Sequence, residues 1–200
     1  KLRKLAKLSA ESKLIAATDV DGISDPEVRK KVNALILDFD EARPRHQRDL
    51  ALLAEIKRLG GTATVEVDAP LWLREITGDE ALPVFGRVTE IALNERTDGH
   101  KEATPKKDGD RVTDEWLKKW LSGQDRIRRL EVSGTAVTSA GLVHLKGLKE
   151  LEVLNVCLTA VADEGFEHLA GCTKMKRMVV CSSKITGSGF KDLGGFTQLE

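Results

Sequence analysis

The chain has 200 residues and a formal net charge of +0, with 32 basic and 32 acidic side chains. This length suits one compact domain or a short repeat array, and the balanced charge argues against nucleic acid or an anionic membrane surface as a partner. No apolar run approaches the roughly 18 residues of a membrane-spanning helix, so we expect no membrane insertion.

Residues 1–61 are predicted to form a helical N-terminal cap region. Residues 1–17 read as a basic, partly helical lead-in, and because the first residue is not Met we expect a processed or trimmed chain. Asp25 and Pro26 signal the start of a helix. Its apolar face is predicted to contain Val28, Val32, Leu35, Ile36 and Phe39. A second helix is predicted over 46–59.

Residues 62–200 are predicted to form a second region, which begins with a capping strand. In GGTATVEV, residues 60–67, Gly60 closes the preceding helix, and Val65 and Val67 share one face of the strand. The stretch 68–85 is predicted only as an irregular part of the cap.

Three segments further along superpose without a gap at a spacing of 24 residues. They are IRRLEVSGTAVTSAGLVHLKGLKE from Ile127, LEVLNVCLTAVADEGFEHLAGCTK from Leu151 and MKRMVVCSSKITGSGFKDLGGFTQ from Met175. Apolar residues recur at positions 1, 4, 6, 11, 16 and 19 of each segment. The alternation around positions 4 and 6 predicts a short strand, and the spacing of positions 16 and 19 predicts a short helix.

An older fourth copy is predicted to start near residue 88. Val88, Ile91 and Leu93 occupy positions 1, 4 and 6, and VTDEWLKKWL from Val112 resumes the helix. Between them, Asn94 to Arg111 lacks large apolar residues and is predicted to be an exposed loop.

Position 15 holds Gly141, Gly165 and Gly189, where a missing Cβ would let neighbouring helices approach closely. The fourth copy carries Trp116 there, from which we expect that no full-length helix packs tightly on that side. A single segment of one strand and one helix cannot bury both of its apolar faces. Neighbouring copies are therefore predicted to stack, with the helical N-terminal region capping the first copy.

The pattern resembles the leucine-rich repeat proteins, most closely the short bacterial type that reads LxxLxLxxTxVTDxGLxxLxxL. The resemblance implies a right-handed α/β solenoid with a parallel concave sheet and a helical N-terminal cap. Position 9, often Asn in the wider family, is Thr135, Thr159 and Ser183, so hydroxyls are expected to bond the turn backbones. The cysteines are also similar to those of the cysteine-rich repeats of F-box substrate receptors, although those repeats are longer by about two residues and place the cysteine at a different phase.

The function implied by the resemblance is a non-catalytic scaffold that binds a protein or peptide on the concave strand face. Its contact residues are predicted at strand positions 3, 5 and 7: Glu90, Ala92, Asn94, Arg129, Glu131, Ser133, Val153, Asn155, Cys157, Arg177, Val179 and Cys181. The alternative for this face is that its side chains are merely solvated. Alternatives for the protein are a substrate-recruiting subunit of a ligase-type complex and a regulatory segment of a larger enzyme.

Chemical sites receive little support. No GxSxG, HExxH, P-loop or GxGxxG motif occurs, so no catalytic residue, cofactor or enzymatic activity is predicted. His144 and His168 share position 18, but two ligands leave a zinc ion underliganded, so no metal is predicted. The loop DVDGISD from Asp19 departs from the calcium-binding pattern.

Cysteine usage is the only indication of location. Cys157 and Cys181 share position 7 of adjacent strands, where a disulfide is conceivable, but with three separated cysteines and no CxxC pair we expect reduced thiols. Reduced thiols favour the cytoplasm, and the localisation is otherwise open.

The sequence stops in phase, with Leu199 at position 1 of a next unit. The apolar edge left by Phe190 and its neighbours then lacks a polar capping unit. We therefore expect either further repeats or end-to-end self-association of this chain.

Overall fold

The computed structural model describes residues 25–69, 71, 74, 85–94, 112–181 and 184–199. The predicted lead-in, the DVDGISD loop up to Ser24, most of the irregular stretch and the loop 95–111 lie outside the described residues. The chain divides into two compact units, residues 1–51 with 65–87 and residues 52–64 with 88–200.

Helix α3 runs without interruption over Pro26–Arg58. Its start is capped as predicted, because the Glu27 N–H donates to Asp25 Oδ1 at 2.9 Å. The prediction of two separate helices is wrong: the chain stays helical through Pro44, since a proline removes one backbone donor and can bend a helix without ending it. Side chains of the predicted apolar face between Val28 and Phe39 are outside the described residues.

The end of α3 confirms the predicted role of Gly60. This residue has a φ of +77°, a conformation that favours glycine. The Gly61 N–H donates to the Ile56 carbonyl at 2.9 Å, and the Gly60 N–H donates to the Lys57 carbonyl at 3.1 Å. These bonds satisfy carbonyls that the last helical turn leaves without partners.

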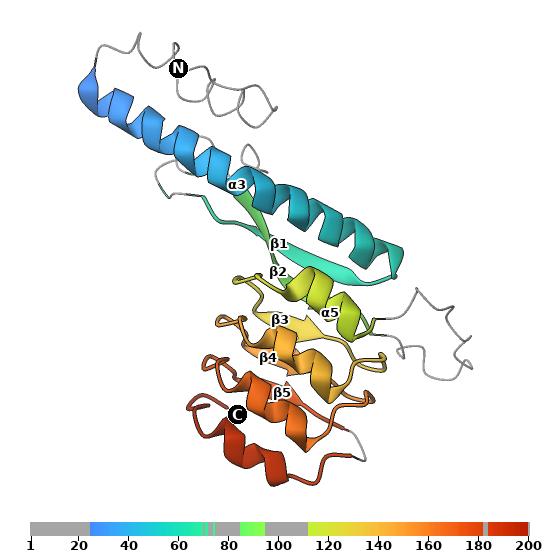
Figure 1. Ribbon diagram of the computed structural model, residues 1–200. Helices are drawn as coiled ribbons and strands as arrows, with labels where there is room; N and C mark the ends of the chain where they lie inside the picture. The colour runs from blue at the N-terminus through green and yellow to red at the C-terminus, as the bar shows by residue number, and fades with distance from the viewer. Residues whose placement is uncertain are drawn as a thin grey trace. The chain divides into compact units, whose positions relative to one another are not determined.

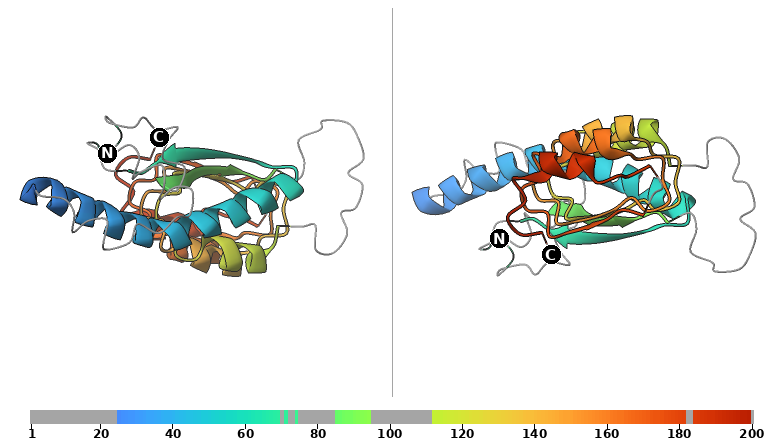
Figure 2. Two further views of the ribbon diagram at one scale, coloured as in Figure 1. Left: turned by 90° about the horizontal axis from the view of Figure 1, so that it is seen from above. Right: turned by 90° about the horizontal axis from the view of Figure 1, so that it is seen from below.

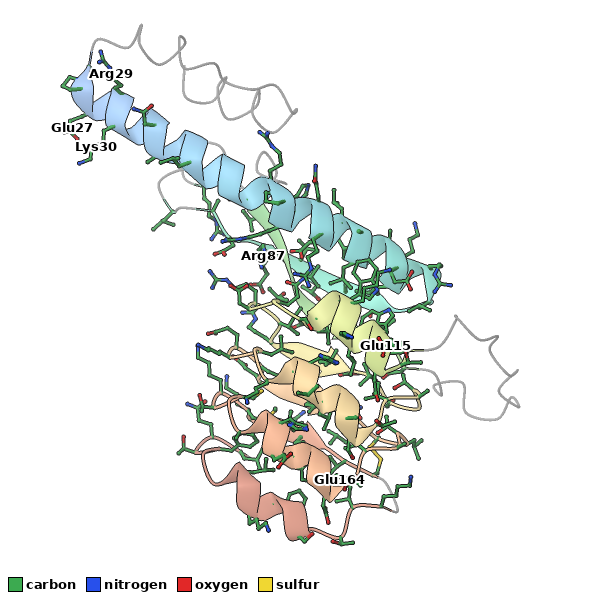
Figure 3. All side chains as sticks on the ribbon, viewed as in Figure 1. Glu27, Arg29, Lys30, Arg87, Glu115 and Glu164 are labelled. Carbon is green, nitrogen blue, oxygen red and sulfur yellow. A yellow bond between two sulfur atoms is a disulfide. The ribbon has the colours of Figure 1, made fainter. Side chains whose placement is uncertain are left out.

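The first unit contains a buried ion pair. Arg87 Nε donates to Asp49 Oδ2 at 3.2 Å, and the two side chains are only 9% and 4% exposed (Figure 3). The nearby Asp68 N–H donates to the Phe85 carbonyl at 2.9 Å. Because both charges are shielded from water, their mutual attraction offsets part of the cost of burying them.

A five-stranded sheet follows the chain order (Figure 1). Its strands are β1 (Thr62–Val67), β2 (Gly86–Ala92), β3 (Arg129–Glu131), β4 (Val153–Asn155) and β5 (Arg177–Val179). β2 to β5 pair in parallel, and β1 forms one edge of the sheet, so a strand lies where one was predicted in residues 60–67. In the last two ladders Leu130 faces Leu154 and Leu154 faces Met178, so the 24-residue spacing is kept across three strands.

Short helices alternate with these strands, as predicted. They are the α-helix α5 (Asp114–Leu121) and the 3₁₀ helices η3 (Ser139–Leu145), η4 (Asp163–Leu169) and η5 (Ser188–Leu193). Along the stack of segments the helices lie on one side and the parallel strands on the other (Figure 2). The molecule is therefore an α/β protein with an N-terminal helix and a mostly parallel sheet. Among the described residues no helix is long and apolar enough to cross a membrane.

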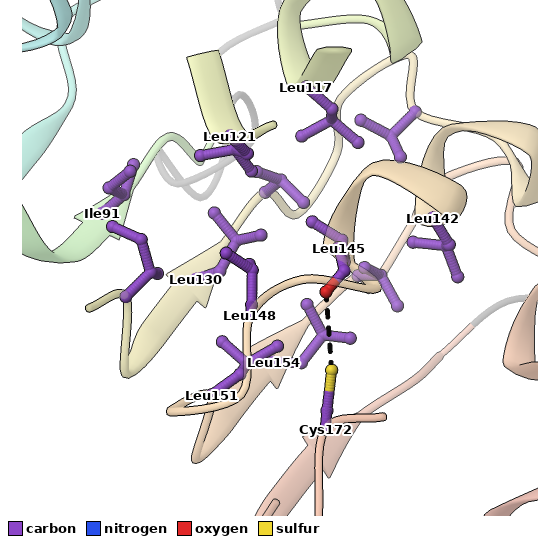
Figure 4. Close-up of a cluster of buried hydrophobic side chains, with 14 of the residues drawn as sticks. Ile91, Leu117, Leu121, Leu130, Leu142, Leu145, Leu148, Leu151, Leu154 and Cys172 are labelled. Carbon is purple, nitrogen blue, oxygen red and sulfur yellow. Dashed lines mark hydrogen bonds between the residues drawn. The ribbon is translucent and has the colours of Figure 1, made fainter. Parts of the chain in front are cut away.

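The phased apolar positions fill the space between strands and helices (Figure 4). In the first segment they are at most 1% exposed: Ile127, Leu130, Val132, Val137, Leu142 and Leu145. In the third segment burial weakens, since Met175 is fully buried whereas Phe190 is 46% exposed. Burial of one such aliphatic side chain contributes about 1.5–3 kcal/mol, so the first two segments supply most of the core stabilisation in this part.

Hydroxyl groups bond the turn backbones after the strands, as predicted from position 9. The Thr135 hydroxyl donates to the Val132 carbonyl at 2.6 Å, and the Thr159 hydroxyl donates to the Val156 carbonyl at 2.7 Å. Each bond satisfies a carbonyl close to the end of a strand. Ser183 lies outside the described residues.

One polar side chain per segment links the start of each helix to the next segment. The Asp114 carboxylate accepts from the Thr138 N–H at 2.8 Å and from the Thr138 hydroxyl at 2.6 Å. In the following segment the Ser139 hydroxyl accepts from the Ala162 N–H at 2.9 Å. Asp163 makes the same type of contact with the next helix start. These bonds fix the lateral register of the helices.

Position 15 is a point of close approach between helices, as predicted. A Cβ added at Gly165 would lie 2.9 Å from Leu142 Cδ1 and 3.1 Å from Ser139 Cα. The interpretation of Trp116 is wrong, however. Trp116 is only 7% exposed and belongs to the same buried cluster as Leu52 and Ile56 of α3. The last turns of α3, from Leu52, therefore contribute to the packing on that side, and the indole fills space there.

Candidate binding face

The twelve predicted contact residues fall on three parallel rows that cross the sheet. The ladders place Glu90 beside Arg129, Arg129 beside Val153, and Val153 beside Arg177. The second row follows two residues later along each strand, and the third lies where the strands end. We call this set the strand face; it comprises Glu90, Ala92, Asn94, Arg129, Glu131, Ser133, Val153, Asn155, Cys157, Arg177, Val179 and Cys181.

The half of the strand face on β2 and β3 is a closed polar network. Arg129 Nη1 lies 3.2 Å from Glu131 Oε1, and Arg129 Nε lies 3.9 Å from Glu90 Oε2. Asn94 Nδ2 donates to Glu131 Oε2 at 3.2 Å, and Asn94 Oδ1 accepts from the Ser133 hydroxyl at 3.0 Å. Most polar groups in this half therefore already have partners within the protein.

Thr64 on β1 extends this network and was missed by sequence reasoning. Its hydroxyl donates to Glu90 Oε2 at 3.2 Å, and its carbonyl accepts from the Thr89 hydroxyl at 3.5 Å. The alternation in TATVEV did place Thr64 on a different face from Val65. The sequence alone did not indicate that β1 lies directly beside β2 at Glu90.

The half on β4 and β5 is mainly apolar at its exposed surface. Val153 is half-buried, Val179 is 37% exposed, and the exposed Arg177 faces Val153 across the ladder. Asn155 does not add a free polar group here, because its side-chain oxygen accepts from the Cys157 N–H at 3.0 Å. Apart from Arg177, the charged residues of the strand face therefore lie on β2 and β3, and the mainly apolar part begins at β4.

Cys157 and Cys181 form a disulfide, so the prediction of two reduced thiols is wrong (Figure 3, sulfur in yellow). Their Cα atoms are 4.5 Å apart, close to the spacing of about 4.8 Å between paired strands. The Leu158 N–H donates to the Cys181 carbonyl at 3.1 Å, which holds the two segments together beside the bond. The inference from reduced thiols to a cytoplasmic location loses its basis.

Cys172 is the free cysteine among the described residues, and it is buried in the core away from the strand face. Its thiol donates to the Leu145 carbonyl at 3.6 Å (Figure 4). Burial raises the pKa of the Cys172 thiol to about 11, so the thiol stays protonated at neutral pH. It is therefore a packing residue and a poor nucleophile.

The histidines at position 18 lie on the helix side of the segments. His168 Nε2 is 3.7 Å from Glu167 Oε1 on the same helix. In the described part of the chain, no group of three or more His, Cys, Asp or Glu side chains is arranged to hold a metal ion.

No protein-family model matches the chain, and no curated protein matches it at a significant level. The class that the structure itself defines is an α/β domain with a five-stranded, mostly parallel sheet.

Proposed function

We propose that the chain is a leucine-rich-repeat type of solenoid that binds a protein or peptide through its strand face and carries out no catalysis. In this proposal α3 and β1 form the N-terminal cap, and the segments from 88, 127, 151 and 175 are the repeats. The in-phase apolar positions, the constant 24-residue offset of the ladders and the hydroxyls of position 9 support this assignment.

The observation that carries the binding function is the kind of side chains that the paired strands present on the strand face. A polar half with satisfied hydrogen bonds borders an apolar half, and both are presented by paired strands rather than by loops. Protein interfaces commonly combine a small apolar centre with a polar rim. A face held by strand pairing is also preorganised, which lowers the entropic cost of association.

Site-specific photocrosslinking tests the proposal with a matched pair of valines. A benzophenone amino acid replaces Val179 on the strand face, which is 37% exposed, or Val143 on η3, which is 42% exposed. We expect irradiation of cells to yield a defined crosslinked protein from position 179 that is absent from position 143. Equal products from both positions, or products from position 143 alone, would contradict binding through the strand face.

A further inference from the structure

We infer that the β4–β5 half of the strand face binds an extended peptide that places one acidic side chain on Arg177 and small apolar side chains next to it. This inference rests on the proposed function and specifies the chemistry of its partner.

Four charged side chains stand on this face, and three of them already interact. Arg129 lies within 3.2 Å of Glu131 and 3.9 Å of Glu90. Glu90 also accepts from Thr64, and Glu131 accepts from Asn94. Within the described residues, the guanidinium of Arg177 is the charged group of this face that has no ion pair. A partner's carboxylate would give this guanidinium the ion pair that it lacks within the described chain.

The surroundings of Arg177 strengthen a bond to a carboxylate. Val153 is its direct neighbour across the ladder, and Val179 follows two residues later on the same face of β5. Two residues beyond Val179 along the chain, Cys181 forms the disulfide with Cys157. An ion pair flanked by apolar groups is less screened by water than one on a polar surface, and a guanidinium binds a carboxylate through two parallel hydrogen bonds.

The dimensions of this half fit a short extended segment. From position 3 to position 7 a strand advances by four residues, which is about 13 Å at about 3.3 Å per residue. A peptide of about four extended residues covers this distance, with its acidic side chain at one end and apolar side chains over Val179 and the disulfide. Glu90 and Glu131 on the adjoining half repel further negative charge, so one carboxylate fits better than a polyanion such as nucleic acid.

Selection from a random octapeptide library displayed on phage tests this inference. The baits are the wild-type chain, Arg177→Glu, and Lys146→Glu as a control with the same charge change at an exposed residue on the helix side. Because both replaced side chains are exposed, we expect unchanged folding, which circular dichroism and thermal melting verify. Two further variants are Arg177→Gln, which removes the charge without reversing it, and Val179→Glu, which places a charge in the apolar part of the strand face.

The inference predicts that wild type and Lys146→Glu enrich peptides with Asp or Glu next to Val, Ile or Leu. Arg177→Glu should lose these peptides and select Lys or Arg at the same place. For one synthetic acidic peptide, Arg177→Gln should weaken Kd at least tenfold, with a smaller difference at high salt.

Two outcomes would overturn the inference at different levels. Enriched peptides without an acidic residue that bind wild type and Arg177→Glu equally, yet lose binding with Val179→Glu, would refute the acidic partner and leave peptide binding intact. If no peptide is enriched, or if enriched peptides are insensitive to both Arg177→Glu and Val179→Glu, the peptide-binding proposal fails together with the inference.

Discussion

The carboxylate of Asp163 shows how a single half-buried side chain links two segments. It accepts from the Thr186 hydroxyl, from the Thr186 and Gly187 N–H groups at 3.2 and 3.3 Å, and from the Ser188 hydroxyl at 2.8 Å. These bonds, chiefly that of the Thr186 hydroxyl, lower the pKa of Asp163 to about 2. Because they favour the ionised form, they hold the start of η5 only while the carboxylate is charged.

The first prediction concerns this titration. A carboxyl-carbon NMR titration should show Asp163 ionising at a pKa of about 2, and Thr186→Val should move the value back toward 3.8. Since the folded-state pKa is below the unfolded value, the stabilisation is complete above about pH 4 and is lost as the pH falls toward 2. A wild-type carboxyl that titrates near pH 4 would contradict the hydrogen-bond network.

The three cysteines should react in a fixed order. Iodoacetamide at neutral pH should modify none of them in the folded protein, should modify Cys157 and Cys181 after addition of a dithiol reductant, and should reach Cys172 only after unfolding. Peptide mass spectrometry identifies the sites. Alkylation of Cys157 or Cys181 without reductant would show that the thiols are free.

Because the disulfide spans 24 residues, Cys157→Ser with Cys181→Ser should lower the free energy of unfolding by about 3 kcal/mol.

At the scale of the helices and strands, the close contact at Gly165 predicts that a large side chain at this position lowers the stability of the protein. Gly165→Trp forces an indole between η3 and η4 and should destabilise the protein by about 1–3 kcal/mol or more. Gly147→Trp is the matched control, because a Cβ at Gly147 meets nothing within 4 Å. Thermal melts should separate the two variants clearly. Equal melting temperatures would refute the packing role of position 15.

The elements also show what local sequence could determine. The strands and helices after residue 86 were predictable because each segment packs against a segment with the same pattern of apolar residues. The pattern within one segment therefore already indicates which of its side chains are buried. The prediction of a separate second helix over 46–59 was wrong, because local propensity does not decide whether a helix continues through a proline. The burial of Trp116 beside Leu52 and Ile56 depends on a contact between residues distant in sequence, for which the pattern contained no signal.

The candidate site was predictable in a similar way. The residues of the strand face followed from the repeat phase, because equal positions in parallel strands become neighbours. Their mutual bonds did not follow, since the exposed rotamers of Arg129 and Glu131 depend on the neighbours they meet. The disulfide was geometrically conceivable from the phase, but cysteine count alone favoured thiols and gave the wrong result.

At the scale of the whole molecule, apolar surface remains exposed on the last segment. Phe190 is 46% exposed while its ring stacks on the buried Phe166 with centroids 5.4 Å apart, and Leu199 is 44% exposed. We propose that two copies of this chain associate through this surface around a twofold axis. Light scattering at increasing concentration should show a dimer, and Phe190→Ser should weaken it.

Val143→Ser provides the control for this association, since Val143 is similarly exposed at 42% but lies on η3. It should leave the dimer unchanged. A strictly monomeric mass for the unaltered chain at high concentration would contradict the proposed association, as would equal weakening by both substitutions.

The constant register of β3, β4 and β5 has a genetic consequence. Arg129 faces Val153 and Val153 faces Arg177, so any residue in this region has an equivalent 24 positions away. If recombination joins a residue to the one that follows its equivalent, a stretch of 24 residues is either removed or duplicated. The strands and helices then stay in phase, wherever the crossover falls. Under the proposed repeat assignment, the protein can therefore change its length in steps of 24 residues, and the surface that its strands present can be reshuffled without a new core having to arise.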